Sequence, residues 1–363
     1  MLEKIVTKFG GSSLADDEQF KKVRSILELE PARRYLVPSA PGKRFKEDEK
    51  VTDLLYRCQA LAAQGKDFTP EFAKIADRYI SIARGLKLET EINGRLEEVR
   101  AGIAAGKNKD WVASRGEYLN GMLLADYLGF PFVDAADVIC FNASGNLLMT
   151  ETMLALREKL ADMPKAVIPG FYGAGPNGEV ITFSRGGSDI TGSLVARAVR
   201  AEIYENWTDV SGILVVDPRI VPEAKPIEKI TYRELRELAY MGASVLHEDA
   251  IFPVRKAGIP IRIRNTNHAD APGTMILKDA ADVEAPPVTG IAGKKDFSII
   301  RIEKAQMNSE IGFGRRALEA FELSGINFEH MPSGIDTLSV FVHQPEFEGK
   351  EQQVLAAIHR LTD

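Results

Sequence analysis

The sequence KIVTKFGGSSLADDEQF, residues 4–20, places a lysine, two glycines and two serines between an apolar run and an amphipathic segment. The apolar run before the glycines is typical of a short β-strand, and the apolar residues from Phe20 onward recur at helical spacing. Gly10 and Gly11 therefore fall at a strand-to-helix turn, where backbone N–H groups can approach an anion. The segment predicts a phosphate-binding turn with Lys8 beside it, and an ordinary tight turn with a surface lysine is the alternative.

The composition indicates a globular chain with no strongly basic surface. The chain has 363 residues, of which 45% are hydrophobic, so it can bury the cores of two or three domains. The net charge is −6 and the basic residues are scattered, which argues against a nucleic acid or an anionic membrane as a partner. We find neither a signal-peptide pattern nor an apolar stretch long enough to span a membrane, and we expect a cytoplasmic protein.

The cysteines and histidines predict no metal centre. Cys58 and Cys140 lie far apart in apolar surroundings, which is typical of buried thiols rather than of a disulfide or zinc framework. The five histidines show no H-E-x-x-H or similar spacing. We therefore expect no metal held by protein ligands alone.

Strand-like and helical segments alternate along most of the chain. Runs such as KAVIPGF, AEIYENW and GILVV are interleaved with helical runs such as DITGSLVARAVRA, which predicts an α/β sandwich around a mostly parallel sheet. Residues 279–290, DAADVEAPPVTG, are rich in Ala, Pro and Asp and predict a linker. The order β-α-β-β-α expected after it is the beginning of a ferredoxin-like unit.

A second glycine-containing turn follows the logic of the first. TFSRGGSDITGSLVARAV, residues 182–199, reads as a strand, a glycine pair and a helix. Arg185 offers a planar fork for a carboxylate or phosphate, Ser188 offers a hydroxyl group, and Asp189 places a carboxylate in the first helical turn. The alternative is that Asp189 only caps the helix and that Arg185 is solvated.

A third segment has side chains suited to a nucleotide. In WTDVSGILVVDPRIVP, residues 207–222, an aromatic ring stands beside Thr208, Asp209 and Arg219, and prolines keep the loop extended. These groups match the base, ribose and outer phosphate of a nucleotide. No P-loop motif accompanies them.

The segment SRGE offers a carboxylate with two interpretations. Glu117 follows Ser114 by three residues near an expected helix start, which is the spacing of a capping box. The other interpretation is that Glu117 binds a substrate.

Taken together, these segments resemble the aspartokinase family of the amino-acid kinase superfamily. The matching segments, in order, are KFGGSS, VPSAPG followed by VTDLL, SRGE, RGGSD, WTDVSGILVVDPRIVP and GASVLH, and the tail from Val288 resembles the ACT regulatory units of that family. The resemblance implies a catalytic domain at residues 1–285, with an aspartate-binding lobe at about 1–200 and a nucleotide-binding lobe at about 201–285. It also implies an incomplete ACT-like domain at residues 286–363.

The implied activity is phosphorylation of the β-carboxylate of L-aspartate by MgATP, which gives 4-phospho-L-aspartate and ADP. This is the first step toward lysine, threonine and methionine. The resemblance assigns Lys8 to the transferring phosphoryl group and Asp189 to the organisation of that lysine and of the metal–phosphate assembly. Mg²⁺ would arrive with ATP rather than be held in a protein cage.

The resemblance also implies which residues bind each substrate. Arg185 would hold the α-carboxylate of aspartate, and Glu117 its α-ammonium group. The implied substrate-binding residues are Ser39, Thr52, Glu117, Arg185 and Ser188. The implied ATP-binding residues are Lys8, Gly10, Gly11, Ser12, Thr208, Asp209, Arg219 and Ser244.

The chain departs from the family pattern at two positions and in its tail. Ser244 stands where the family commonly has a lysine that reaches the nucleotide phosphates, and Glu248 stands where it usually has a proline. A second ACT unit is absent from the sequence, so we expect a truncated chain with an open sheet edge and a homodimer formed through this region. The positions implied for a lysine or threonine effector are Met307, Gly312, Phe313, Asn327 and Glu329.

Two other functions remain open from the sequence. One is another amino-acid kinase, acting on glutamate, acetylglutamate or carbamate, although the pair Arg185 and Glu117 argues against acetylated and carbamoyl substrates. The other is a catalytically silent amino-acid sensor, which Ser244 favours and which Lys8 and Asp189 oppose.

Overall fold

The computed structural model describes residues 3–184, 186–240, 246, 248–278 and 288–362. The chain divides into two units, Met1–Ala292 and Gly293–Asp363. Within the described residues no helix is both long and apolar enough to cross a bilayer.

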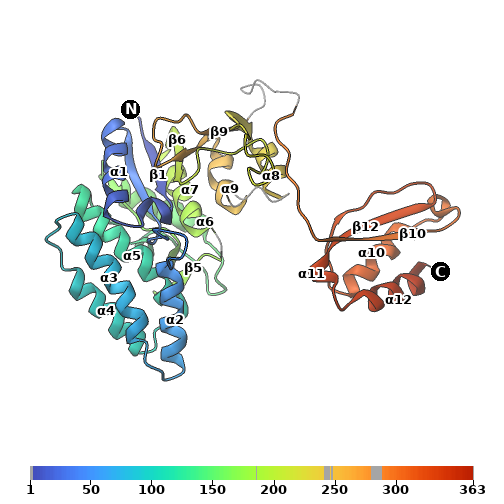
Figure 1. Cartoon of the computed structure of the whole chain (residues 1–363), viewed down its shortest axis with the longest axis horizontal. Helices are drawn as coiled ribbons and strands as arrows, with labels where there is room; N and C mark the ends of the chain where they lie inside the picture. The colour runs from blue at the N-terminus through green and yellow to red at the C-terminus, as the bar shows by residue number, and fades with distance from the viewer. Residues whose placement is uncertain (1–2, 185, 241–245, 247, 279–287, 363) are drawn as a thin grey trace. The chain divides into compact units, whose positions relative to one another are not determined.

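The first unit is built on a seven-stranded sheet, with strand order β3-β2-β1-β6-β8-β9-β7 (Figure 1). Its strands are β1 (Ile5–Phe9), β2 (Arg33–Pro38), β3 (Ala166–Val167), β6 (Ile203–Thr208), β7 (Lys229–Thr231), β8 (Ile261–Asn265) and β9 (Thr274–Leu277). Every neighbouring pair is parallel except β8 with β9. The prediction of a mostly parallel sheet is therefore confirmed. A separate antiparallel hairpin joins β4 (Tyr172–Ala174) to β5 (Val180–Thr182).

Helices cover both faces of this sheet. They are α1 (Asp17–Leu29), α2 (Val51–Ala63), α3 (Thr69–Gly85), α4 (Ile92–Ala104), α5 (Lys109–Leu128), α6 (Met149–Leu160), α7 (Gly187–Val199), α8 (Tyr232–Tyr240) and α9 (Glu248–Ala257), with 3-10 turns η1 (Gly11–Leu14) and η2 (Ala135–Asp137). Figure 1 shows α2 to α5 packed side by side. The prediction of a strand at GILVV, residues 212–216, is wrong. Gly212 has φ +118°, and Leu214 makes only an isolated bridge to Pro226.

Side chains that alternate between the two faces of the central strands contribute to two separate hydrophobic cores. On β1, Val6 belongs to the core that includes α6, α7 and α9, whereas Phe9 belongs to the core that includes α1 to α5. On β6, Tyr204 and Trp207 divide in the same way. Because side chains two residues apart share a face, Lys8 lies on the α7 side of the sheet with Val6.

One buried carboxylate holds the opposite face of the sheet together. Glu205 of β6 is 2% exposed, and its two carboxylate oxygens accept from Arg33 Nε at 2.7 Å and Nη2 at 3.2 Å. Trp207 Nε1 donates to the same group at 2.9 Å, and Arg264 Nη1 lies 3.5 Å from it. Trp207 is buried and stacks on Phe9 with ring centroids 6.0 Å apart, so its ring is unavailable to a nucleotide base.

The second unit has its own antiparallel sheet and core. Its elements are β10 (Phe297–Glu303), η4 (Met307–Ser309), α10 (Phe313–Leu323), β11 (Phe328–His330), β12 (Thr337–His343), α11 (Gln344–Phe347) and α12 (Glu351–Thr362). The strand order is β10-β12-β11. The expected β-α-β-β-α order is confirmed and fits an ACT-like unit, with the four-residue α11 preceding α12.

We predict that Glu205→Ala lowers the free energy of unfolding by about 3–5 kcal/mol, because it leaves the buried guanidinium group of Arg33 and the partly buried one of Arg264 without their carboxylate. Urea unfolding at pH 7 measures this loss. The matched control is Glu28→Ala, which removes an exposed partner of Arg24 and should cost far less. Equal losses in the two variants would contradict the assignment.

Candidate functional site

The carboxyl ends of three adjacent parallel strands meet at one edge of the sheet. Phe9 at the end of β1 is in register with Pro38 of β2 and with Trp207 of β6. The Gly10 amide donates to the Trp207 carbonyl at 2.9 Å, and the Ser39 amide donates to the Phe9 carbonyl at 3.0 Å. The three loops that follow these strands therefore begin side by side, at the edge where open α/β sheets bind ligands.

An ion pair lies at this edge on the α7 side. Lys8 is 8% exposed, and its Nζ lies 2.6 Å from Asp189 Oδ1. Asn206 joins both groups: its Nδ2 donates to Asp189 Oδ1 at 2.8 Å, and its Oδ1 accepts from Lys8 Nζ at 3.4 Å. Asn206 stands opposite Lys8 in the β1–β6 register. Asn206 is not among the residues predicted from the sequence, where its only signal is a polar pair, Glu205 and Asn206, within the largely apolar run AEIYENW.

The start of α7 brings Asp189 to this position. The helix begins after Gly186, which has φ +58°, and no side-chain hydrogen bond caps it. Asp189 stands in the first turn, and its carboxylate points to Lys8 and Asn206. The alternative that Asp189 only caps the helix is therefore wrong. A Cβ on Gly192 would meet Tyr204 Oη at 2.6 Å, so this glycine lets α7 approach β6 closely.

The opening glycine turn packs against a second loop. A Cβ on Gly11 would lie 2.8 Å from the Ala40 carbonyl oxygen, and the Gly42 amide donates to the Gly11 carbonyl at 2.8 Å. Gly10 has φ −68°, which any residue adopts, so close backbone approach at Gly11 is the constraint that requires glycine here. The turn leads into η1 rather than directly into α1.

Glu117 lies inside α5 and faces the loop after β2. The helix begins at Lys109 and is capped by Asn108, so the capping-box interpretation of Ser114 and Glu117 is wrong. Glu117 is buried, and burial raises the pKa of its carboxyl group to about 8, partly offset by a hydrogen bond from the Ala40 backbone.

Two buried acceptors on this face of α5 have no hydrogen-bond partner within the described residues. They are Oε2 of Glu117 and Oδ1 of Asn120. The two residues are three apart and therefore share a helix face. Asn120 Nδ2 donates to the Ser39 carbonyl at 2.7 Å, which links this face to the loop after β2. Asn120 is a second residue that the sequence analysis missed, because its role depends on how α5 packs.

Three other residues predicted to bind the substrate lie on α2, on the loop after β2 and on α7. Thr52 lies in the first turn of α2, and Ser39 follows β2. Ser188 is buried near the start of α7, where a Cβ on Gly170 would meet its Oγ at 2.6 Å. Arg185 lies outside the described residues.

The predicted nucleotide residues are only partly brought together. Ser12 is half-buried in η1, and Thr208 Oγ1 at the end of β6 donates to Asp209 Oδ1 at 3.1 Å. Arg219 pairs with Asp217, two residues earlier, at 2.6 Å, and its side chain is exposed. Ser244 lies outside the described residues.

The predicted effector residues lie in the second unit. Met307 and Phe313 are buried in its core, so only their backbone groups are available to a ligand. Gly312 has φ +82° and directly precedes α10. Asn327 is exposed, and Glu329 pairs with Lys294 at 3.5 Å.

Comparison with known proteins connects this geometry to one group of enzymes. Residues 3–265 match the amino acid kinase family. The chain is 40% identical to aspartokinase 3 of Bacillus subtilis over 96% of its own length and 80% of that protein. It is 29% identical to chloroplastic aspartokinase 1 of Arabidopsis thaliana over 95% of its own length, and it spans 64% of that protein. The crystal structure of aspartate kinase from Clostridium acetobutylicum matches with a TM-score of 0.93 and 52% identity, over 98% of this chain and 82% of that one.

The raised pKa of Glu117 predicts a pH dependence of stability. In the folded chain the carboxyl group keeps its proton up to about pH 8, whereas the unfolded chain loses it near its ordinary value of 4.5. This group's contribution to stability is therefore fully present at low pH and is lost as the pH rises toward 8. Between pH 4.5 and about pH 8, the urea midpoint of the wild-type protein should therefore fall relative to that of Glu117→Gln. Parallel pH profiles of the two proteins would contradict this.

Proposed function

Because the chain belongs to the aspartokinase family of amino acid kinases, we propose that the edge formed by β1, β2, β6 and α7 is its phosphoryl-transfer site. The reaction is transfer of the γ-phosphoryl group of ATP to the β-carboxylate of L-aspartate, the first step of the aspartate-derived amino-acid pathway. The products are 4-phospho-L-aspartate and ADP. Because the donor is ATP, we propose that the reaction takes place in the cytoplasm.

The chemistry requires positioning and charge neutralisation rather than a base. The β-carboxylate of aspartate is already ionised at neutral pH and can attack the γ-phosphorus directly. Negative charge then lies on the transferring phosphoryl group and on both flanking oxygens. Lys8 is the proposed cation for this charge, and its contacts to Asp189 and Asn206 fix the position of Nζ before the substrates bind.

The observation that carries the proposal is the pair of unsatisfied acceptors on α5. A buried carboxylate oxygen and a buried amide oxygen without donors are costly unless a ligand supplies the donors. The ammonium group of a free amino acid has three N–H donors and a positive charge. Bound between Glu117 and Asn120, it would satisfy both oxygens and favour the ionised form of Glu117. Acetylated or carbamoyl substrates lack this cation.

The nucleotide is proposed to bind along the loops that follow β1 and β6. The Gly10 amide donates to the Trp207 carbonyl, so the proposed phosphate contacts are the amides of Gly11 and Ser12 at the start of η1. Thr208 ends β6 at the same edge of the sheet, and Asp209 follows it. Mg²⁺ enters as part of the MgATP substrate, coordinated mainly by phosphate oxygens.

A coupled assay of ADP release tests this function. We predict release only when ATP, Mg²⁺ and L-aspartate are all present, and much slower turnover with L-glutamate, N-acetylglutamate or carbamate in place of aspartate. Glu117→Gln should raise KM for aspartate strongly, since the ammonium group loses its counter-charge. Equal or faster turnover with another acceptor would contradict the substrate, and no turnover with any acceptor would favour a silent sensor.

We also propose that the second unit forms a homodimer with weak or absent feedback inhibition by lysine or threonine. Strand β10 lies at one edge of its sheet with β12 as its neighbour, and Ile299 on it is 59% exposed. An open strand edge with apolar side chains favours pairing with another chain. The burial of Met307 and Phe313 leaves few side chains of this unit for an effector.

Light scattering should therefore give the mass of two chains, and titration with lysine or threonine should change aspartate-dependent ADP release little. An Ile299→Lys variant, which places a charge at an exposed position of β10, should weaken the dimer. A monomeric mass would remove the interface. Strong inhibition at submillimolar effector would show that this single unit suffices for regulation.

A further inference from the structure

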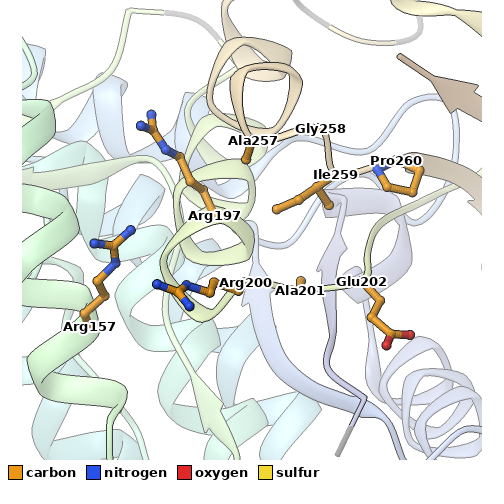
Figure 2. Close-up of a pocket in the computed structure, with 9 residues that line it drawn as sticks. All are labelled: Arg157, Arg197, Arg200, Ala201, Glu202, Ala257, Gly258, Ile259 and Pro260. Carbon is orange, nitrogen blue, oxygen red and sulfur yellow. The ribbon is translucent and has the colours of Figure 1, made fainter. Parts of the chain in front are cut away.

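A cavity lies at the opposite end of α7 from Asp189. It has a volume of about 480 Å³, and three of the residues that line it are Arg157 of α6 and Arg197 and Arg200 at the end of α7. Asp189 and Arg200 are separated by about 16 Å along the helix axis, at 1.5 Å per residue. In Figure 2 the guanidinium groups of Arg197 and Arg200 extend from α7 toward the side where Arg157 projects from α6.

These three cations have no ion-pair partner in the described part of the chain. None of their guanidinium groups forms an ion pair or a hydrogen bond with another described residue. Nη1 of Arg197 is buried and has no hydrogen-bond partner among the described residues. A buried N–H donor of a charged group without an acceptor is costly. Glu202 also lines the cavity and pairs with none of the three. Glu202, Arg157 and Arg200 are exposed, whereas Arg197 is half-buried.

Helix stability accounts for only part of this cluster. Arg157 and Arg197 stand in the last turns of α6 and α7, where a cation interacts favourably with the helix dipole. The interaction with the helix dipole does not explain why Nη1 of Arg197 is buried without a hydrogen-bond partner among the described residues. Arg200 has φ +53° at the end of α7, a left-handed position that glycine usually fills. An arginine here retains a positive charge in the cavity at a cost in backbone strain.

A smaller apolar cavity adjoins the first. It has a volume of about 320 Å³, is lined by Met149, Met153 and Leu154, and shares Arg157 and Arg197 with the larger cavity. Leu154 is 58% exposed. The shared arginines therefore separate a cationic cavity from an apolar one.

We propose that these two cavities form a binding site for an organic anion, separate from the phosphoryl-transfer site. The anionic group, a phosphate or a carboxylate, binds among Arg157, Arg197 and Arg200, because guanidinium groups match the geometry of both anions. The apolar part of the ligand lies along Met149, Met153 and Leu154. The site does not depend on the proposed reaction, although α7 connects it to Asp189.

Calorimetric titration of the full chain tests this site, with phenyl phosphate as the phosphate probe and phenylacetate as the carboxylate probe. The titrations use a Lys8→Ala background, so that binding at the phosphoryl-transfer site does not dominate. Arg197→Gln should weaken binding of the preferred probe about tenfold or more. The matched control, Arg84→Gln, changes an exposed arginine of α3 and should leave the affinity unchanged.

A second variant, Leu154→Asp, should also weaken binding, because it introduces a negative charge beside the apolar cavity. It lies at an exposed position, so it keeps the test valid if Arg197→Gln does not fold. Tighter binding of phenyl phosphate identifies a phosphate ligand, and tighter binding of phenylacetate identifies a carboxylate ligand. No millimolar binding of either probe, or unchanged affinity in Arg197→Gln and Leu154→Asp, would overturn the proposal.

Discussion

The ion pair between Lys8 and Asp189 depends on the N-terminal strand β1 and on two consecutive elements, α7 and β6, that follow much later in the sequence. Lys8 comes from the central strand β1, Asp189 from the first turn of α7, and Asn206 from the neighbouring strand β6. The pair forms only if β1 and β6 are in parallel register and α7 packs closely against β6. The glycines support this arrangement, since Gly192 admits α7 to the sheet and Gly11 admits the loop after β2 to the opening turn.

The local features of the site were predictable from the sequence, and the long-range ones were not. Apolar periodicity and glycine turns predicted the parallel sheet and both strand-to-helix turns, since these depend on neighbouring residues. Asn206 and Asn120 were missed, because their contacts depend on strand register and on helix packing. Ser114 and Glu117 match a capping box, but Asn108 caps α5 six residues earlier than Ser114 would. Local spacing cannot decide between two possible helix starts.

Helix α7 carries two different electrostatic environments. At its first turn, a carboxylate pairs with a lysine whose charge is proposed to act on a phosphoryl group. At its C-terminal end, two arginines face a cavity together with Arg157 of α6, and none of the three pairs with a carboxylate in the part of the chain that the structure describes. The first environment contains an ion pair, whereas the arginines of the second have no ion-pair partner among the described residues, so a bound anion would supply one. Any movement of α7 on anion binding would also reach Asp189.

The central claim is that Lys8 and Asp189 act as one unit on the transferring phosphoryl group. A double-mutant cycle on aspartate-dependent ADP release measures this directly, using Lys8→Ala, Asp189→Ala and the double variant. The account predicts that kcat falls far more than KM for aspartate rises, and that the double variant is about as slow as Lys8→Ala alone. A rise in KM without a loss of kcat, or losses that multiply in the double variant, would contradict it.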